Sequence, residues 1–450
     1  MDRRWTIRVV VGLTAFITML DNTVVTAAAP SIARDLGIPL TTLEWVATAY
    51  LITFAGLLLA GGRLADGYGP HRVLRHGLWV FTIASALAAA AGGAGTLIAA
   101  RAVQGAGAAL VVPASLAIVA TREERERVRC IAIWTGAGAV GLALGPSLGG
   151  VLAEHAARPW IFLLNVPVGA LAWFLVRRTR GCRGETPGTA GLDWGGLVTG
   201  SLALTAATYA LIAGTAHGFT DGPVLGAGAV AIGAALAFAP VERRAVAALV
   251  DVRLFAVRAF SGGIAVQILW GLGVNGVYFY TAVYLQGVRG FTPTGAGLAF
   301  LPLAVAVAAG APLTPALVTR FGAGRTVAAG LVLVAAGMTA VAAGGTTATL
   351  LAALAVIGFG SALTVPLGAC VLGAVPADRA GVAAGVFGVA REVSGVLGIA
   401  GVGVVVGAGA DVGRGYAYGL LMAAALVLAG ALLSVKTLPS YAHHRDSIRD

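Results

Sequence analysis

The sequence predicts an all-α polytopic membrane protein, in which fourteen transmembrane helices form two six-helix halves plus two inserted helices. Three observations support this prediction: the apolar composition, the number of long apolar runs, and an internal repeat. Apolar residues make up 58% of the 450-residue chain and charged residues only 11%. A soluble fold of this size cannot cover its surface with so few charges, so lipid must surround most side chains.

The apolar runs are long enough to cross a bilayer, which takes about 20 mostly apolar residues per helix. They are continuous and show no two-residue alternation, which excludes a β-barrel. The first run is too long for a leader peptide and is interrupted by Asp21 and Asn22, so we expect it to be the first membrane helix. The predicted spans are 7–29, 43–61, 74–91, 96–120, 130–152, 160–176, 194–213, 223–239, 259–285, 295–317, 326–343, 349–375, 381–407 and 416–435.

The distribution of Lys and Arg predicts the orientation. With a cytoplasmic N-terminus, 24 of the 30 basic residues fall in cytoplasmic segments and 4 in outer loops, while Arg101 and Arg391 lie within spans. Basic residues are retained on the cytoplasmic side of membranes. The count therefore predicts a multi-pass protein of the cytoplasmic membrane with both termini in the cytoplasm, and it accounts for the net charge of +11.

An internal repeat predicts the domain organisation. Shifting the chain by 253 positions places Asn22 on Asn275, Gly37 on Gly290, Gly69 on Gly322 and Pro113 on Pro366. Residues 1–178 and 259–450 are then two six-helix halves, and 179–258 holds two inserted helices with cytoplasmic connectors. Parallel six-helix repeats are typical of transporters that bind substrate between their halves.

Five motifs follow one another in the first half of the chain. They are Leu20-Asp21-Asn22-Thr23 in the first span, the loop from Gly62 to Arg72, Arg101 with Gln104 and Gly105 in the fourth span, the small-residue run from Gly141 to Gly150 in the fifth, and Trp160 with Asn165-Val166-Pro167-Val168-Gly169 at the sixth.

In this order the motifs resemble the fourteen-helix drug:proton antiporter family of the major facilitator superfamily, and the resemblance covers the whole chain. It implies a proton-coupled antiporter that exports small apolar or cationic organic compounds, such as drugs and antibiotics, across the cytoplasmic membrane. The proton gradient would supply the energy, without a cofactor. The alternative is a dedicated exporter of one endogenous metabolite or antibiotic.

Other functional classes find little support in the sequence. None of the six histidines lies inside an apolar run, and no nucleophile–base pair, metal-ligand cluster or phosphate-binding loop is present, so we expect neither an enzyme nor a metal site. Basic residues interleaved with aromatics are also missing, which argues against nucleic acid as a partner. The expected partners are a small-molecule substrate, protons and the lipid bilayer, with the protein acting as a monomer.

Asp21 and Arg101 are charges within predicted spans, and such charges normally have a function. Asp21 is a candidate proton carrier or substrate counter-ion, because an apolar environment disfavours the charged form of a carboxyl group; a structural role near the outer helix end is the alternative. A buried guanidinium needs a carboxylate or several carbonyls as partners. Asp21 and Glu44 are both candidate partners of Arg101, in a proton-sensitive or a fixed link.

Arg391 and Glu392 form a second charged group, in the thirteenth span. Neighbouring helix positions point about 100° apart, so we expect these two residues not simply to pair with each other. One of them is a candidate titratable or cation-binding group that faces the substrate cavity. A structural link near the cytoplasmic end is the alternative.

The loop after the second span is a candidate gate. The resemblance implies a gating contact from Asp66 to a helix of the other half, whereas a turn-forming role is the alternative reading of the same residue. Relatives carry more basic residues at the positions of Gly67, Pro70 and His71, so any charge latch here is expected to be weaker. The residues of this candidate gate are Gly62, Asp66, Gly69 and Arg72.

The small-residue run in the fifth span is a candidate hinge. Small residues let helices approach closely and proline permits a bend. The resemblance implies that the run seals the protein against proton leak, and close helix packing is compatible with that role. Its residues are Gly141, Gly145, Pro146, Gly149 and Gly150.

Further polar and aromatic residues are candidates for lining a substrate cavity, although aromatic side chains are equally expected in the core or at the membrane interface. The candidates are Asn22, Gln104, Trp134, Asn165, Trp270, Asn275 and Tyr278.

Overall fold

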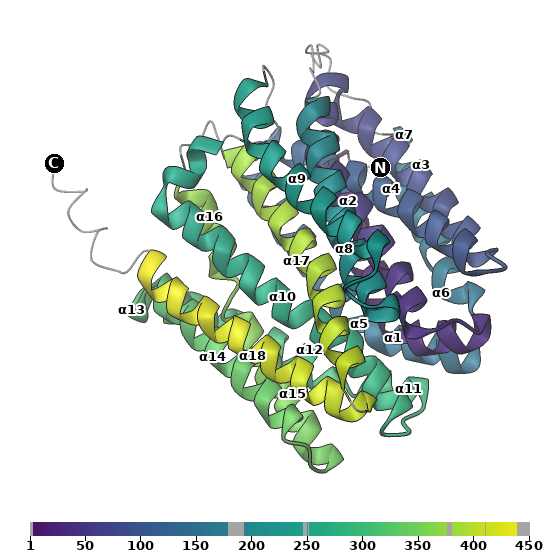
Figure 1. The fold of residues 1–450 in the computed structure, drawn as a ribbon. Coiled ribbons are helices and arrows are strands. Elements are labelled where there is room, and N and C mark those ends of the chain that lie inside the picture. The colour runs from purple at the N-terminus through teal and green to yellow at the C-terminus, as the bar shows by residue number, and fades with distance from the viewer. Residues whose placement is uncertain are drawn as a thin grey trace. The chain divides into compact units, whose positions relative to one another are not determined.

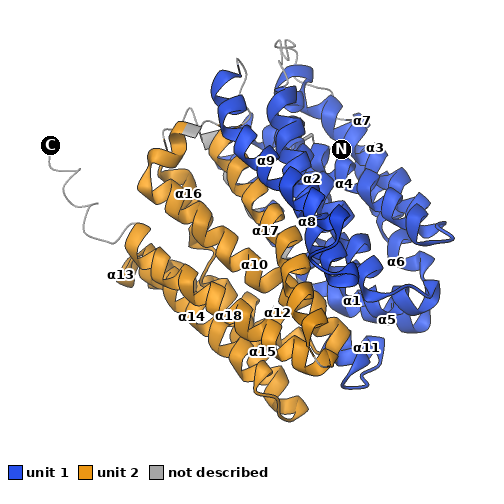
Figure 2. Ribbon diagram, in the orientation of Figure 1, with its two compact units in different colours: residues 1–249, 285–298 blue, residues 250–284, 299–450 orange. Residues whose placement is uncertain are grey.

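The computed structural model describes residues 3–178, 193–245, 250, 252–375, 380–409 and 411–438, and these residues are helical apart from their connections (Figure 1). The helices divide into two compact units (Figure 2). Unit 1 comprises residues 1–249 and 285–298, and unit 2 comprises residues 250–284 and 299–450.

Unit 1 holds the first nine helices. Within it α1 packs along α5, α2 and α3 pack against α4, and α8 packs against both α9 and α2. The inserted pair α8 and α9 therefore groups with the first half of the chain, and so does the short α11. The helices are α1 (Arg3–Leu36), α2 (Leu40–Tyr68), α3 (Pro70–Ala89), α4 (Ala94–Ala120), α5 (Glu124–His155), α6 (Pro159–Leu163), α7 (Asn165–Arg178), α8 (Trp194–His217), α9 (Gly222–Arg244) and α11 (Pro293–Leu298).

Unit 2 holds most of α10 and the later helices. Here α14 packs against α15 and α18, α12 packs against α15, and α17 packs against α18. The elements are η1 (Val252–Ala256), α10 (Arg258–Gly287), α12 (Leu301–Gly310), η2 (Ala311–Leu313), α13 (Thr314–Phe321), α14 (Ala323–Ala342), α15 (Thr347–Ala362), α16 (Pro366–Gly373), α17 (Ala380–Ala408) and α18 (Val412–Thr437).

All fourteen predicted spans coincide with helical segments. Thirteen segments of the described chain are long and apolar enough to cross a membrane. The fourteenth is the 20-residue α3, whose first turns carry His71, Arg72, Arg75 and His76 and so lower its hydropathy. The fold-class prediction is therefore confirmed.

Three spans are divided in a way that hydropathy does not show. The span 295–317 consists of α11, α12, η2 and α13, the span 349–375 consists of α15 and α16, and the span 160–176 consists of α6 and α7. Most of the pieces begin with proline in their first turn, as at Pro302 and Pro366. Proline has no N–H to donate to the preceding turn, so it fits the start of a helix and interrupts its interior.

Two turns show the same backbone conformation in both halves of the repeat. Gly37 and Gly290 have φ angles of 62° and 67°, and Gly69 and Gly322 have φ angles of 90° and 82°. Each pair is separated by 253 residues, which is the offset of the repeat. Positive φ is accessible to glycine at little cost, which explains why glycine stands at these turns.

The outer surface of the inserted helices is apolar and exposed. On α9, Leu225, Ile232 and Leu236 are 58–72% exposed. A contiguous apolar surface of this kind is unfavourable in water and is typical of helices that face lipid.

Candidate functional site

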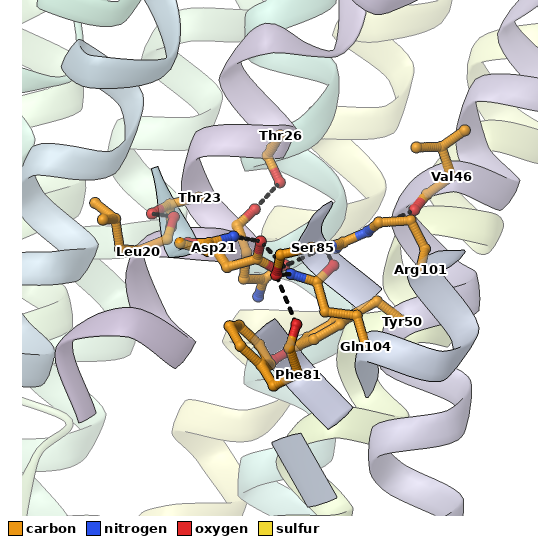
Figure 3. Close-up of polar contacts among 12 residues, drawn as sticks. Leu20, Asp21, Thr23, Thr26, Val46, Tyr50, Phe81, Ser85, Arg101 and Gln104 are labelled. Atoms are coloured by element: carbon orange, nitrogen blue, oxygen red, sulfur yellow. Dashed lines mark hydrogen bonds and ion pairs between the residues drawn. The ribbon is translucent and has the colours of Figure 1, made fainter. Parts of the chain in front are cut away.

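A fully buried polar network lies inside unit 1 around Asp21, in the middle part of α1 (Figure 3). Its carboxylate accepts three hydrogen bonds from two other helices. Asp21 Oδ2 lies 2.6 Å from Arg101 Nη1, while Asp21 Oδ1 accepts from Gln104 Nε2 at 2.8 Å and from Asn165 Nδ2 at 2.5 Å. Because both charged side chains are completely inaccessible to solvent, this is a buried ion pair.

The structure identifies the partner of Arg101 as Asp21. Arg101 also donates from Nη1 to Gln104 Oε1 at 2.7 Å and from Nε to the carbonyl oxygen of Val46 on α2 at 3.2 Å. Its guanidinium carbon lies 4.5 Å from the ring centroid of Tyr50, so the face of the cation rests on an aromatic ring. Glu44 is also buried on α2, but the carboxylate bound to Arg101 is that of Asp21.

Ser85 on α3 completes the network, and the sequence analysis did not single it out. Its hydroxyl donates to the carbonyl oxygen of Phe81 at 2.8 Å, so Ser85 Oγ accepts from Gln104 Nε2 at 2.9 Å. This contact fixes the orientation of the Gln104 amide, with its oxygen toward Arg101. A lone serine in the apolar stretch of a helix was the available signal, but the sequence could not show which helix it faces.

Gln104 and Asn165 were expected to line a cavity, and the structure contradicts this. They are 0% and 1% exposed and bind Asp21 instead. Buried amides next to an ion pair satisfy lone pairs and protons that the pair alone would leave unpaired. The two residues therefore belong to the charged network and not to an open surface.

The other cavity candidates lie apart from the network. Trp134 packs against an apolar cluster that includes Val10, Val11 and Cys130. Asn22 is half-buried on α1. In unit 2, Asn275 donates to the carbonyl oxygen of Gly271 at 3.0 Å.

Trp270 and Tyr278 are also in unit 2, on α10. The Trp270 Nε1 atom is buried and has no hydrogen-bond partner among the described residues. The Tyr278 ring meets the Phe300 ring edge-on at 6.3 Å. Tyr278 therefore makes an aromatic contact within unit 2.

Arg391 and Glu392 pair directly, so the expectation that they would not is wrong. Arg391 Nε and Nη2 both donate to Glu392 Oε1, at 2.9 and 2.7 Å. The directions of the Cβ atoms diverge, but both side chains are long enough to bend together across the helix surface. Divergent Cβ directions keep short side chains apart but do not prevent contact between two long ones.

The structure corrects one expectation for the candidate gate. Asp66 does not lie in a turn, because α2 continues to Tyr68. The turn is at Gly69, which has a φ of 90° and donates its N–H to the carbonyl oxygen of Ala65 at 3.1 Å. Asp66, before this turn, and Arg72, after it, are both exposed.

Gly62 is likewise not the glycine of close approach at this end of α2. A Cβ atom at Gly62 would lie 3.9 Å from Pro113, which is ordinary contact. A Cβ atom at Gly61 would instead overlap the carbonyl oxygen of Ala109 on α4. Gly61 therefore permits the tight packing of α2 on α4.

The candidate hinge lines two helices of unit 1. Cβ atoms at Gly141 and Gly149 would lie 2.6 and 2.5 Å from carbonyl oxygens of α1, and one at Gly145 would overlap Thr23 Oγ1. Spacings of four residues place these three glycines on one face of α5. The α5 helix can therefore approach the α1 backbone closely, next to the turns that carry Asp21.

Gly150 and Pro146 face α11. A Cβ atom at Gly150 would overlap the carbonyl oxygen of Pro293, and one at Gly297 would overlap the carbonyl oxygen of Pro146. Glu154 Oε2 accepts the backbone N–H of Thr294 at 2.8 Å, in the first turn of α11. The run of small residues thus packs α5 against α1 on one side and against α11 on the other.

Comparison with known proteins agrees with this arrangement. The model of the Major Facilitator Superfamily matches residues 11–399. The puromycin resistance protein of Streptomyces alboniger is 36% identical over 412 residues, which are 88% of this chain and 81% of that protein. The multidrug resistance protein Stp of Mycobacterium tuberculosis is 34% identical, over 87% of this chain and 74% of that protein. The structure of a D-xylose–proton symporter matches with a TM-score of 0.70 at 15% identity, covering 97% of this chain and 98% of the symporter chain.

Proposed function

The chain belongs to the major facilitator superfamily, and from this premise we propose that it exports small organic compounds in exchange for protons. The observation that carries the proposal is the buried ion pair of Asp21 and Arg101, which joins α1 to α4 inside unit 1. Relatives more than 30% identical are named as antibiotic and multidrug resistance proteins, which supports export as the direction of transport.

We propose Asp21 as the proton carrier. A charged carboxylate in a low-dielectric interior depends on its counter-ion and its hydrogen bonds. Protonation removes that charge, so Arg101 and the amides of Gln104 and Asn165 lose their common acceptor. The contacts of α1 with α4 and α7 therefore differ between the two protonation states, and this difference couples the proton to a conformational change.

The breadth of the substrate range separates two versions of this function. One relative is named for multidrug resistance and another for resistance to a single antibiotic, so both a broad exporter and a dedicated one have support. We favour small apolar or cationic compounds as substrates. The protein acts as a monomer with both termini in the cytoplasm, and the connection after α2 serves as the cytoplasmic gate.

Inverted membrane vesicles that contain the protein test the proposal. Respiration builds a proton gradient, and addition of ethidium is expected to dissipate it partly while the dye accumulates; vesicles without the protein serve as the control. Dissipation by puromycin but not by ethidium would favour a dedicated exporter. If neither compound moves or dissipates the gradient, broad export is contradicted and a dedicated exporter of another compound is favoured.

The contact between α5 and α11 gives a separate prediction. Replacing Gly150 by valine is expected to raise passive proton leak severalfold, because its side chain would overlap backbone of α11 that cannot rotate away. The leak is measured as the decay of an imposed pH gradient in proteoliposomes that contain a pH-sensitive dye. The matched control is Gly136→Val on the same helix, where a Cβ atom meets nothing within 4 Å. Equal leak in the two variants would show that the small-residue run does not seal the protein.

A further inference from the structure

The described part of unit 2 contains a single charged pair in the interior of its helices. Among its described residues, Arg391 and Glu392 lie in the middle part of α17. The other described charged residues stand at helix ends or in connections: Arg253, Arg258, Arg320, Arg325, Asp411, Arg414 and Lys436. A charged pair at membrane depth is costly, so its presence points to a function.

The accessible end of this pair is the cation. The side chain of Arg391 is 34% exposed, whereas that of Glu392 is 8% exposed. Both hydrogen bonds of the guanidinium use Nε and Nη2 and end on the same oxygen of Glu392. The outer edge of the guanidinium, formed by Nη1 and the second proton of Nη2, makes no hydrogen bond to the described residues. Two parallel donors on that edge match the two oxygens of a carboxylate.

The exposed surface of Arg391 continues along one face of α17. Toward the N-terminal end of α17 the same helix face is exposed at Ala384 and half-buried at Phe387. Toward the C-terminal end of α17 the same helix face is buried, at Gly395 and Gly398. A guanidinium open to hydrocarbon at mid-span is strongly unfavourable, so we expect water to reach Arg391 along this strip from the N-terminal end of α17.

We infer that Arg391 is a docking point for the anionic group of an organic acid, so that the protein accepts carboxylate substrates as well as the compounds proposed above. This inference rests on the proposed export function and deepens it. Glu392 holds the guanidinium in place and balances its charge. Recognition then depends on directional hydrogen bonds and not on net attraction, which leaves binding weak enough for release.

Two xanthene dyes of similar shape and opposite charge test the inference: fluorescein, which carries a carboxylate, and the cation rhodamine 123. Binding to the full-length protein in lipid nanodiscs is measured by fluorescence anisotropy. The wild type is expected to bind fluorescein, and Arg391→Gln is expected to weaken this binding by about tenfold or more, as for loss of a bidentate charge-assisted contact. Binding of rhodamine 123 is expected to remain within about twofold, since it lacks the carboxylate that the contact requires.

The controls separate docking from folding. Arg414→Gln removes an exposed arginine of the same unit and is expected to leave binding of fluorescein unchanged. Should Arg391→Gln fail to fold with Glu392 unpaired, the double variant Arg391→Gln/Glu392→Gln removes both charges and is expected to show the same selective loss. Arg391→Lys keeps the charge without the planar edge and is expected to restore little.

Three results would overturn the inference: no binding of fluorescein to the wild type, no effect of Arg391→Gln, or equal weakening of both dyes. Any of these together with intact ethidium antiport would refute the docking point alone. Selective loss of fluorescein binding in a protein without antiport would instead refute the proposed coupling and leave the docking point standing.

Discussion

Replacing Asp21 by asparagine is expected to abolish proton-coupled export while the protein still folds and inserts. The amide is nearly isosteric with the carboxylate, and its oxygen can still accept the hydrogen bonds of Gln104 and Asn165. Its NH2 group then faces Arg101 Nη1, so some loss of stability is expected beside the loss of transport. It cannot take up a proton, so the two states of the network no longer interconvert. In inverted vesicles, addition of substrate to this variant is expected to leave the proton gradient unchanged.

The matched control is Asp35→Asn. Asp35 lies on the same helix and also pairs with an arginine, Arg158, at 2.7 Å, but its side chain is 57% exposed. An exposed pair contributes little, so transport in this variant is expected to match that of the wild type. Proton-coupled transport that persists in Asp21→Asn would remove Asp21 from the mechanism and shift attention to Glu392 or Glu44.

The sequence was sufficient to predict the membrane spans. Hydropathy located all fourteen, because every helix in lipid must be apolar over the full thickness of the bilayer. The repeat predicted turns that the structure shows in the same conformation, as at Gly69 and Gly322. Hydropathy did not locate the breaks within spans. A proline such as Pro366, which starts a new helix inside a span, does not interrupt the apolar run in which it stands.

The residues of the candidate site were predicted better than their contacts. Asp21 and Arg101 stood out because charges are rare at membrane depth, but whether Arg101 binds Asp21 or Glu44 depends on how three helices rotate about their axes. Ser85 was missed for the same reason. The pairing of Arg391 with Glu392 was missed because the flexibility of long side chains overrides the divergence of their Cβ atoms. Neutral polar residues acquire a role only through neighbours that the sequence does not identify.

Replacing Arg101 by methionine is expected to give the largest loss of stability among the site variants. Methionine keeps much of the side-chain volume but leaves Asp21 buried without its counter-ion, and breaking a buried pair in this way costs about 3–5 kcal/mol. Thermal unfolding of the purified protein in detergent measures this loss.

The double variant Asp21→Asn/Arg101→Met separates the structural from the functional role of the pair. With both charges removed, most of the decrease in unfolding temperature caused by Arg101→Met is expected to be reversed. Antiport is expected to remain absent, because no titratable group is left at this position. A double variant as unstable as Arg101→Met would show that Arg101 stabilises the fold through Val46, Tyr50 and Gln104 and not through Asp21. Antiport in a stable double variant would show that the proton travels elsewhere.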